Sequence, residues 1–353
     1  MINSYAVVMP SIKIGGGNRV LLQFLDEAIK DNKNCKLFYL DRKGETFNNL
    51  PLNSISKRVR GDGILSIVLF SILLSFKIRF DKSIEAVVVS DPILSICSFI
   101  YANKRRVRFV QSNDFLLFEG NLKGGSLFNL IYQYLFKASQ KFQYHTVLFN
   151  SNYSLISYNK TLSITQHYSA DYIINLAVFT LKYEKNIGIY PNIDSIRVCI
   201  VTSLHPRKGY QQFLEIAKNS KLKGVNYIVI SQDDLDSKLS NVTHLKPKSD
   251  NEYVTALKQC HFILSTSTFE GFGLPLIEAM AIGLVPIAFY NPGMDQYNSD
   301  KNITIIDDVV DFDNKIIEIT NDNDRYIKLS TTAVKTASIF TMQNFYFSMI
   351  NKI

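Results

Sequence analysis

Residues 267–281 have the sequence STFEGFGLPLIEAMA, and they follow an apolar run at 262–264 that is typical of a buried strand. Gly271 and Gly273 allow backbone dihedrals and close approaches that a side chain would forbid. Pro275 suits the first position of a helix. We therefore predict a strand, a glycine-rich turn and a helix whose N-terminus presents free N–H groups to an anion.

Two carboxylates flank this turn, Glu270 at its entrance and Glu278 eight residues later. A carboxylate cannot neutralise a phosphate, so we expect both groups to accept hydrogen bonds from hydroxyls, such as those of ribose or a hexose. The simpler alternatives are that Glu278 lies in the first helical turn and complements the helix dipole, and that Glu270 caps the turn.

Short apolar runs alternate with helical patterns along most of the chain, which predicts α/β structure with parallel sheets covered by helices on both faces. The expected strands lie at 5–9, 36–40, 85–89, 107–110 and 146–149 in the first half, and at 198–201, 227–230, 244–245, 262–264 and 285–288 in the second. Two such halves indicate two Rossmann-like domains facing a central cleft.

The alternation lapses at 177–194, which we interpret as a linker between an N-terminal domain, 1–176, and a C-terminal domain, 195–337. With 353 residues, of which 46% are hydrophobic, the chain is long enough to bury two cores.

Lysine and arginine (39) exceed aspartate and glutamate (31) by 8, which indicates an anionic partner: a phosphorylated small molecule, nucleic acid or an acidic membrane. The sequence has no helix-turn-helix, RNA-recognition or zinc motif that would favour nucleic acid. The four cysteines stand far apart without metal-ligand spacing, so neither a disulfide framework nor structural zinc is expected. The first residues lack a basic and apolar leader, so a cytoplasmic location is expected.

Residues 64–76 are apolar apart from three serines. As a helix they reach about 20 Å, short of a hydrocarbon core of about 30 Å. They form either a core helix or a helix lying on a membrane surface, and basic residues at 57–60 and 77–82 favour anionic lipid for the second. A third basic cluster, at 104–108, is expected on the same membrane-facing side.

The string E-G-F-G-L-P-x-x-E-A-M-A resembles the signature of glycosyltransferase family 4. The resemblance implies a GT-B fold, a retaining reaction without metal or other cofactor, a nucleotide sugar held mainly by the second domain, and a last helix, 338–353, that returns to the first. It also implies that Glu278 binds the nucleotide ribose and that Glu270 contacts the donor sugar at the catalytic centre. The backbone amides implied to face the diphosphate or sugar are those of Gly271, Phe272, Gly273 and Leu274.

A second block, VTSLHPRKG, ends at Gly209, where the family usually has G-R-L-x-x-x-K-G. Lys208 matches the family lysine, and the resemblance implies that it grips the diphosphate in catalysis. Thr202 and Ser203 replace the family Gly and Arg, which removes a bidentate phosphate contact. Arg207 is the nearest residue that could compensate, unless it is only a solvated loop charge.

A third block, GGGNR at 15–19, follows the first expected strand but does not complete the dinucleotide pattern G-x-G-x-x-G. The resemblance implies instead that Gly16 and Gly17 approach the donor phosphates or sugar. Arg19 either binds sugar or acceptor, or merely occupies the first helical turn. The block resembles a subset that includes bacterial rhamnosyltransferases.

Gln111 and Asn113 follow the strand at 107–110, near a point where many family members have a histidine. A neutral amide cannot act as a base, so we expect these residues to hydrogen-bond to the sugar or acceptor. Pro247 belongs to a loop, HLKP, that resembles the family loop whose backbone meets the nucleobase, and the resemblance implies that role here.

We predict a retaining hexosyltransferase that moves a sugar from a nucleotide-diphosphate donor to a glycan acceptor. Family habit and the basic, apolar region around 57–82 indicate a polyprenyl-diphosphate-linked acceptor in bacterial O-antigen, lipopolysaccharide or capsule synthesis, at the inner face of the cytoplasmic membrane.

Three alternatives remain open. Ser203 and Gln111 would suit a non-catalytic GT-B remnant that acts as a scaffold or activator. Asp234-Leu235-Asp236 spells the D-x-D motif of metal-dependent GT-A transferases, although 311–313 and 322–324 match equally well. Glu270 and Glu278 could also serve a glycosidase as a carboxylate pair.

Overall fold

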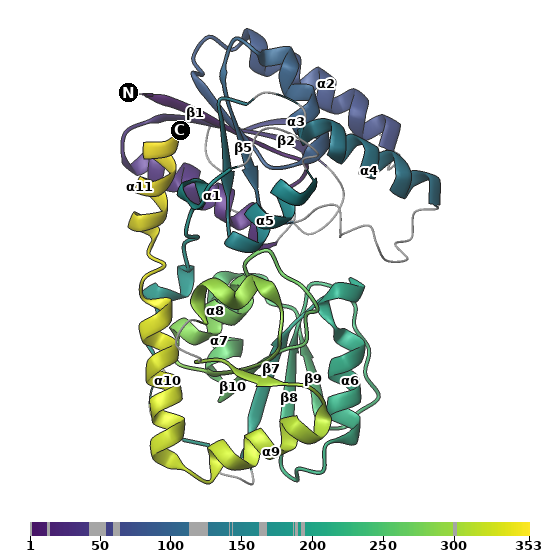
Figure 1. The fold of residues 1–353 in the computed structure, drawn as a ribbon, viewed down its shortest axis with the longest axis vertical. Helices are drawn as coiled ribbons and strands as arrows, with labels where there is room; N and C mark the ends of the chain where they lie inside the picture. Colours follow the sequence, from purple (N-terminus) through teal and green to yellow (C-terminus); the bar gives the residue numbers. More distant parts are fainter. Residues whose placement is uncertain are drawn as a thin grey trace. The chain divides into compact units, whose positions relative to one another are not determined.

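The computed structural model describes residues 2–12, 15–41, 54–58, 64–112, 126–140, 142, 144–161, 168–185, 187, 190–191, 195–298 and 302–353. The chain divides into two compact units, one formed by Met1–Ala177 with Met342–Ile353 and the other by Val178–Thr341. Within the described ranges, each unit contains a six-stranded parallel sheet with helices on its faces (Figure 1).

The N-terminal unit has the strand order β3-β2-β1-β4-β5-β6. Its strands are β1 Ser4–Met9, β2 Asn34–Asp41, β3 Ser54–Arg58, β4 Ala86–Val89, β5 Arg105–Val110 and β6 Thr146–Phe149. Its helices are α1 Gly16–Lys30, α2 Ile64–Phe80, α3 Pro92–Cys97, η1 Ser98–Tyr101, α4 Ser126–Gln140, α5 Asn152–Thr161, η3 Ala170–Tyr172 and α11 Met342–Lys352. The last helix, α11, packs on α1.

The C-terminal unit has the strand order β12-β11-β10-β7-β8-β9. Its strands are β7 Arg197–Val201, β8 Asn226–Ile230, β9 Val242–Leu245, β10 Phe262–Ser265, β11 Val285–Phe289 and β12 Thr304–Ile306. Its helices are η4 Phe179–Lys182, η6 Pro206–Lys208, α6 Tyr210–Asn219, α7 Asp250–Lys258, α8 Leu274–Ala281, η7 Pro292–Tyr297, α9 Val309–Thr320 and α10 Asn323–Ala337.

The fully buried strand β1 feeds two cores because its side chains alternate between the faces of the sheet. Val8 packs in one core with Leu74 and Ile78 of α2. Tyr5 points to the other face, where its ring meets Phe24 of α1 edge-on at 5.5 Å. A continuous apolar run such as 5–9 is therefore what a central strand with helices on both sides requires.

The sequence pattern did not predict β3 and β12, which are the outer strands at one edge of each sheet. An edge strand has one neighbour to pair with and is less covered, so it needs no continuous apolar run. The described side chains of β3 and most of those of β12 are indeed only partly buried or exposed.

One face of helix α2 is buried in the core, and the opposite face exposes apolar side chains. Leu74 and Ile78 are fully buried, whereas Leu69 and Phe80 are 54% and 73% exposed. The interpretation of residues 64–76 as a core helix therefore holds for one face of the helix, which continues to Phe80, and a membrane-surface role for the exposed face stays a prediction. Among the described residues, none of the helices is both long enough and apolar enough to cross a bilayer.

The prediction that the basic cluster at 104–108 is exposed is wrong for two of its residues, Lys104 and Arg108. Lys104 is buried and donates to the carbonyls of Asp81 and Ile84 at 2.7 and 2.9 Å. Arg108 is fully buried on β5 and donates to the carbonyl of Ser90. The charges of these two side chains therefore serve the interior of the N-terminal unit.

In both sheets, a histidine just before one strand makes the same pair of hydrogen bonds to the backbone of an arginine on the neighbouring strand. His145 donates its backbone N–H to Arg106 O, and its Nδ1 accepts from Arg106 N at 3.1 Å. His261 does the same with Arg197 in the other unit, with its Nδ1 also at 3.1 Å from the donor nitrogen. Each imidazole must stay neutral at Nδ1 to accept this bond.

This geometry predicts an acid-sensitive C-terminal unit. Burial, and then the charge of Arg197, lowers the pKa of His261 from 6.5 to about 4. The unfolded chain therefore binds more protons between these pH values, and the free energy of unfolding should fall by about 2 to 3 kcal/mol as the pH drops from 6.5 to 4. Urea denaturation at several pH values measures this loss.

His261→Asn is the matched control, because an amide oxygen can replace Nδ1 as acceptor without titrating. Its loss of stability between pH 6.5 and 4 should be clearly smaller than that of the wild type. An identical pH dependence in both proteins would assign the acid sensitivity to other groups.

Candidate functional site

Two loops that are distant in sequence meet at the carboxyl ends of the neighbouring strands β7 and β10. The backbone N–H of Thr268 donates to the carbonyl of Arg207 at 2.8 Å. The hydroxyl of Thr266 donates to the carbonyl of Gly209 at 2.8 Å. The blocks VTSLHPRKG and STFEGFG therefore form one hydrogen-bonded unit.

Gly209 is required by this contact. Its φ of 66° lies in the left-handed region, and a Cβ there would stand 1.9 Å from the carbonyl oxygen of Thr266. Thr202, which replaces the family glycine, donates its hydroxyl to the carbonyl of Lys208 at 3.1 Å. This departure from the family pattern thus adds a bond that holds the same loop.

Gly209→Ala should destabilise the C-terminal unit by at least about 2 kcal/mol, because it combines left-handed strain with a backbone clash. Urea denaturation of the full chain measures the effect. Gly15→Ala is the control, since no heavy atom of the described residues, apart from the chain neighbours, lies within 4 Å of a Cβ at that position. Equal stability of the two variants would contradict the packing described here.

Lys208 and Glu270 are brought together by the joined loops. Lys208 Nζ lies 2.6 Å from Glu270 Oε1, and both side chains are largely shielded from solvent. Burial acts to raise the pKa of Glu270, but the charges of Lys208 and Arg207 outweigh it and lower the pKa below its usual value. The carboxylate is therefore ionised and fixed at neutral pH.

Arg207 supplies a second positive charge, which helps to lower the pKa of Glu270. Its guanidinium lies 5.3 Å from the centre of the Phe269 ring, a cation–π contact that limits its freedom. Its backbone N–H donates to His205 Nδ1, so His205 caps the short helix η6. Ser203, which replaces the family arginine, carries no charge.

Glu278 lies in the second turn of α8, not in the first as the sequence suggested. It is buried, and its Oε2 accepts from the hydroxyl of Tyr253 at 2.9 Å. Its backbone carbonyl accepts from Thr180 Oγ1 at 2.8 Å. A carboxylate this far into the helix has little dipole to complement, which favours a binding role over that alternative. No sequence motif pointed to Tyr253.

The turn before α8 has the geometry expected of an anion site. Gly273 is the N-cap residue with a φ of 83°, and no side chain caps the helix, which begins at Leu274. Glu270 thus does not cap it. Phe272 is buried against Phe340, with ring centres 5.3 Å apart. The loop from Gly271 onward is thereby anchored while the first N–H groups of α8 remain free of a side-chain cap.

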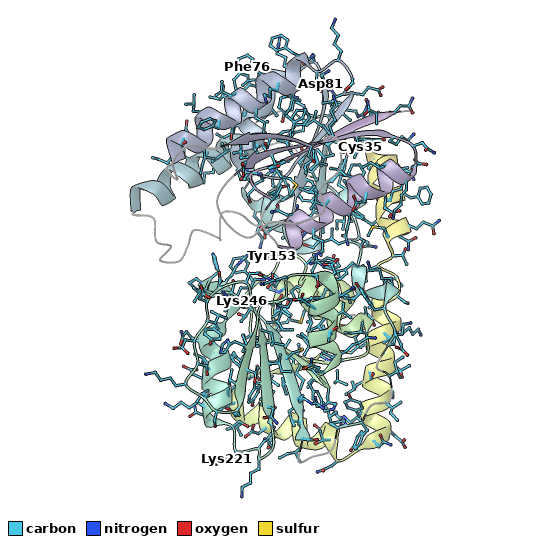
Figure 2. The ribbon with its side chains drawn as sticks, turned by 180° about the vertical axis from the view of Figure 1, so that it is seen from behind. Cys35, Phe76, Asp81, Tyr153, Lys221 and Lys246 are labelled. Carbon is cyan, nitrogen blue, oxygen red and sulfur yellow. The ribbon has the colours of Figure 1, made fainter. Side chains whose placement is uncertain are left out.

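A hollow lies at the carboxyl ends of β8 and β9. This cavity of about 140 Å³ is lined by residues that include Asp233, Asp234, His244 and Lys246. Asp234 pairs with Lys246, labelled in Figure 2, so one carboxylate of the D-x-D string is already engaged. Across the described part of the chain, no three acidic, histidine or cysteine side chains gather as metal ligands.

Pro247 follows β9, and its carbonyl oxygen is occupied by Gln232 Nε2 at 2.8 Å. The family resemblance implies that the backbone of this loop meets the nucleobase, which stays a prediction. Gln232, which holds the loop, was not singled out by any pattern.

In the N-terminal unit, the structure brings Gly17 and Gln111 together. Gln111 Nε2 donates to Gly17 O at 3.1 Å, and a Cβ on Gly17 would stand 2.9 Å from Gln111 Oε1. Gly16 and Arg19 lie in the first turn of α1. Asn113 lies outside the described residues. The predicted sugar-binding amide is therefore bonded to the glycine loop of its own unit.

Residues 190–336 match the family described as Glycosyl transferases group 1. No curated protein is significantly similar to the chain in sequence. Sucrose-phosphate synthase from Thermosynechococcus elongatus shares the fold with a TM-score of 0.78 at 13% identity, over 99% of this chain and 98% of that one.

Two further solved structures match as fully. HepE from Anabaena, in complex with UDP and glucose, has a TM-score of 0.71 at 14% identity over 99% and 98% of the two chains. WaaG, described as a glycosyltransferase involved in lipopolysaccharide biosynthesis, has a TM-score of 0.73 at 14% identity over 98% and 99%. These likenesses, with the two parallel sheets, establish the GT-B fold predicted from the sequence and exclude the GT-A alternative.

Proposed function

We propose that this chain transfers a sugar from a nucleotide-diphosphate donor to a glycan acceptor with retention of configuration. The premise is the match of residues 190–336 to the glycosyl transferases group 1 family. The chain is a glycosyltransferase of the GT-B fold. The observation that carries the donor assignment is the ion pair between Lys208 and Glu270 beside the uncapped start of α8.

The diphosphate would lie between Lys208 and the N-terminus of α8. One ammonium, the guanidinium of Arg207 and the free N–H groups from Gly273 onward all favour negative charge. They stabilise the leaving diphosphate as its charge develops, and they are already oriented before the reaction. The same cations hold Glu270 ionised, so a phosphate that draws Lys208 towards itself leaves a carboxylate ready to accept hydrogen bonds.

The two glutamates would bind the hydroxyl-bearing parts of the donor. Glu270, at the entrance of the turn, accepts from hydroxyls of the transferred sugar. Glu278, held by Tyr253, accepts from the ribose. In the proposed reaction the leaving phosphate takes the proton of the acceptor hydroxyl on the same face of the sugar, so no enzyme nucleophile and no metal is needed. The protein then contributes position and electrostatics.

The charge at position 270 should matter most for transfer. We expect Glu270→Gln to lower turnover at saturating donor by 100-fold or more, because sugar orientation is lost. We expect Glu278→Gln to weaken nucleoside diphosphate binding by about tenfold, the effect of one charged hydrogen bond. A screen of UDP, GDP, ADP and dTDP sugars supplies the donor, and calorimetry with the matching diphosphate measures binding.

Glu215→Gln, on the exposed side of α6, is the matched control and should behave like the wild type. Near-normal turnover of Glu270→Gln would refute the site. Release of free sugar without transfer would favour the glycosidase, and the absence of any diphosphate binding would favour the scaffold. The metal-free mechanism requires full activity in EDTA.

We further propose that the acceptor is a lipid-linked glycan, of the polyprenyl-diphosphate type used for bacterial O-antigen, lipopolysaccharide or capsule, and that α2 places the enzyme on an anionic membrane. The outer stripe of α2 consists of Leu69, Leu73, Phe76 and Phe80, all exposed and spaced at helical intervals. Figure 2 labels Phe76 at the surface of the N-terminal unit.

Basic side chains lie at the C-terminal end of this stripe, where they would favour anionic lipid. Lys77 and Lys82 are exposed next to it. Helix α3 contacts both α2 and α4, and α4 exposes Leu130 and Tyr134, the latter 73% accessible. An apolar stripe beside cations on one unit is the arrangement of an interfacial helix.

Vesicle sedimentation tests this surface. The wild type should pellet with phosphatidylglycerol vesicles and much less with phosphatidylcholine, and binding should weaken with salt. Leu69→Asp with Phe76→Asp should abolish pelleting. Val310→Asp with Ile317→Asp introduces the same charges at exposed apolar positions of α9 and should not. Equal pelleting of both double variants would contradict the assignment.

A further inference from the structure

The segment 291–297, which includes η7, packs beneath the glycine-rich turn of the donor site. Asn291 is buried, and its Oδ1 accepts from Gly293 N at 3.1 Å, which starts the short helix. Asn291 and Tyr297 line the same small cavity as Glu270 and Gly273. The segment follows β11, so it reaches the turn from the strand next to β10.

Gly293 touches the backbone of the catalytic glutamate. A Cβ on Gly293 would stand 2.4 Å from the carbonyl oxygen of Glu270 and 2.8 Å from its carbonyl carbon and Cβ. Gly293 is not among the residues with positive φ. Its lack of a side chain is therefore demanded by Glu270 and not by its own dihedrals, and the segment sets how closely Glu270 can approach.

Tyr297 touches the other end of the turn. Its hydroxyl donates to the carbonyl of Gly273 at 3.3 Å, the same oxygen that accepts the first helical bond of α8 from Leu276 N at 3.0 Å. Its ring is buried between Phe272 and Phe340, with centre distances of 5.4 and 6.3 Å. Tyr297 is thus bonded to the residue whose left-handed conformation starts α8.

A hydroxyl at this depth is not explained by packing. Phenylalanine would fill the same aromatic cluster without the cost of burying an oxygen. Burial, and then the nearby charge of Glu270, raises the pKa of Tyr297, so the hydroxyl stays protonated and remains a donor. Among the described contacts, the hydrogen bond of this hydroxyl is the one to the carbonyl of Gly273.

We propose that segment 291–297 is a positioning element of the donor site, in which Gly293 sets the place of Glu270 and Tyr297 holds the turn from which α8 presents its N–H groups. The inference rests on the proposed function and deepens it, because it assigns separate control of the sugar and of the diphosphate to two residues outside both signature blocks. Gly293 acts through the residue that contacts the sugar, and Tyr297 acts through the helix that contacts phosphate.

Two variants separate these roles. Gly293→Ala should displace Glu270 and lower turnover at saturating donor about 10- to 100-fold. It should leave the dissociation constant of the bare nucleoside diphosphate within about twofold of the wild type, because that ligand has no sugar. Tyr297→Phe should weaken binding of the same diphosphate about three- to fivefold, the effect of one hydrogen bond.

Tyr290→Phe is the matched control. It removes a tyrosine hydroxyl from the residue just before the segment, where Tyr290 is exposed and bonds only to the surface residue Asp295 at 3.1 Å among the described contacts. Turnover and diphosphate binding should both match the wild type. Melting temperatures of all three variants are recorded in parallel.

The outcomes distinguish this inference from the proposed function. If none of UDP, GDP, ADP and dTDP binds the wild type, the proposed function fails and this inference fails with it. If the wild type binds one of them but Gly293→Ala and Tyr297→Phe show wild-type turnover and binding, only the inference is overturned. A lowered melting temperature with unchanged kinetic constants would make the segment purely structural, which also overturns it.

Discussion

The close backbone contact between Gly209 and Thr266 is the constraint on which the rest of the site depends. A carbonyl oxygen stands 1.9 Å from where the Cβ of any other residue would be, and a hydrogen bond of 2.8 Å from the Thr266 hydroxyl to the Gly209 carbonyl holds the loop after β7 against the loop after β10. Lys208 precedes one side of this contact and Glu270 follows the other, and their ion pair at 2.6 Å is its consequence. The ionisation of Glu270 therefore depends on the backbone contact, because that contact brings Lys208 and Arg207 near the carboxylate and they lower its pKa.

In the described parts of the chain, the two units share one architecture, a six-stranded parallel sheet covered by helices, but they expose different kinds of surface. Both are parallel sheets in which a histidine Nδ1 secures the start of a neighbouring strand, and both cover their sheets with helices. In the C-terminal unit polar groups and glycines gather where strands end, which suits a phosphorylated ligand. In the N-terminal unit the apolar helix α2 keeps an exposed stripe. Part of the surplus positive charge accordingly lies at Arg207 and Lys208, and part lies beside that stripe.

Much of the fold followed from patterns in the chain. Central strands such as β1 are buried on both faces and therefore appear as continuous apolar runs, which made all eight described ones recognisable, and the edge strands β6 and β9 were predicted as well. The edge strands β3 and β12 were missed because their outer positions need no such run. Of the basic cluster at 104–108, Lys104 and Arg108 turn inward to backbone carbonyls, and charge alone could not reveal that.

The sequence by itself determined the class of fold and the glycine-rich turn before α8, because alternating apolar runs and helical patterns, two glycines and a proline each have a local structural consequence. Only the tertiary structure decided which residues become partners. Lys208 meets Glu270 across 62 positions, Tyr253 holds Glu278, and Gly293 and Tyr297 support the turn from a third loop. Such partners carry no local signal, since a parallel sheet brings the carboxyl ends of its strands together whatever their distance along the chain.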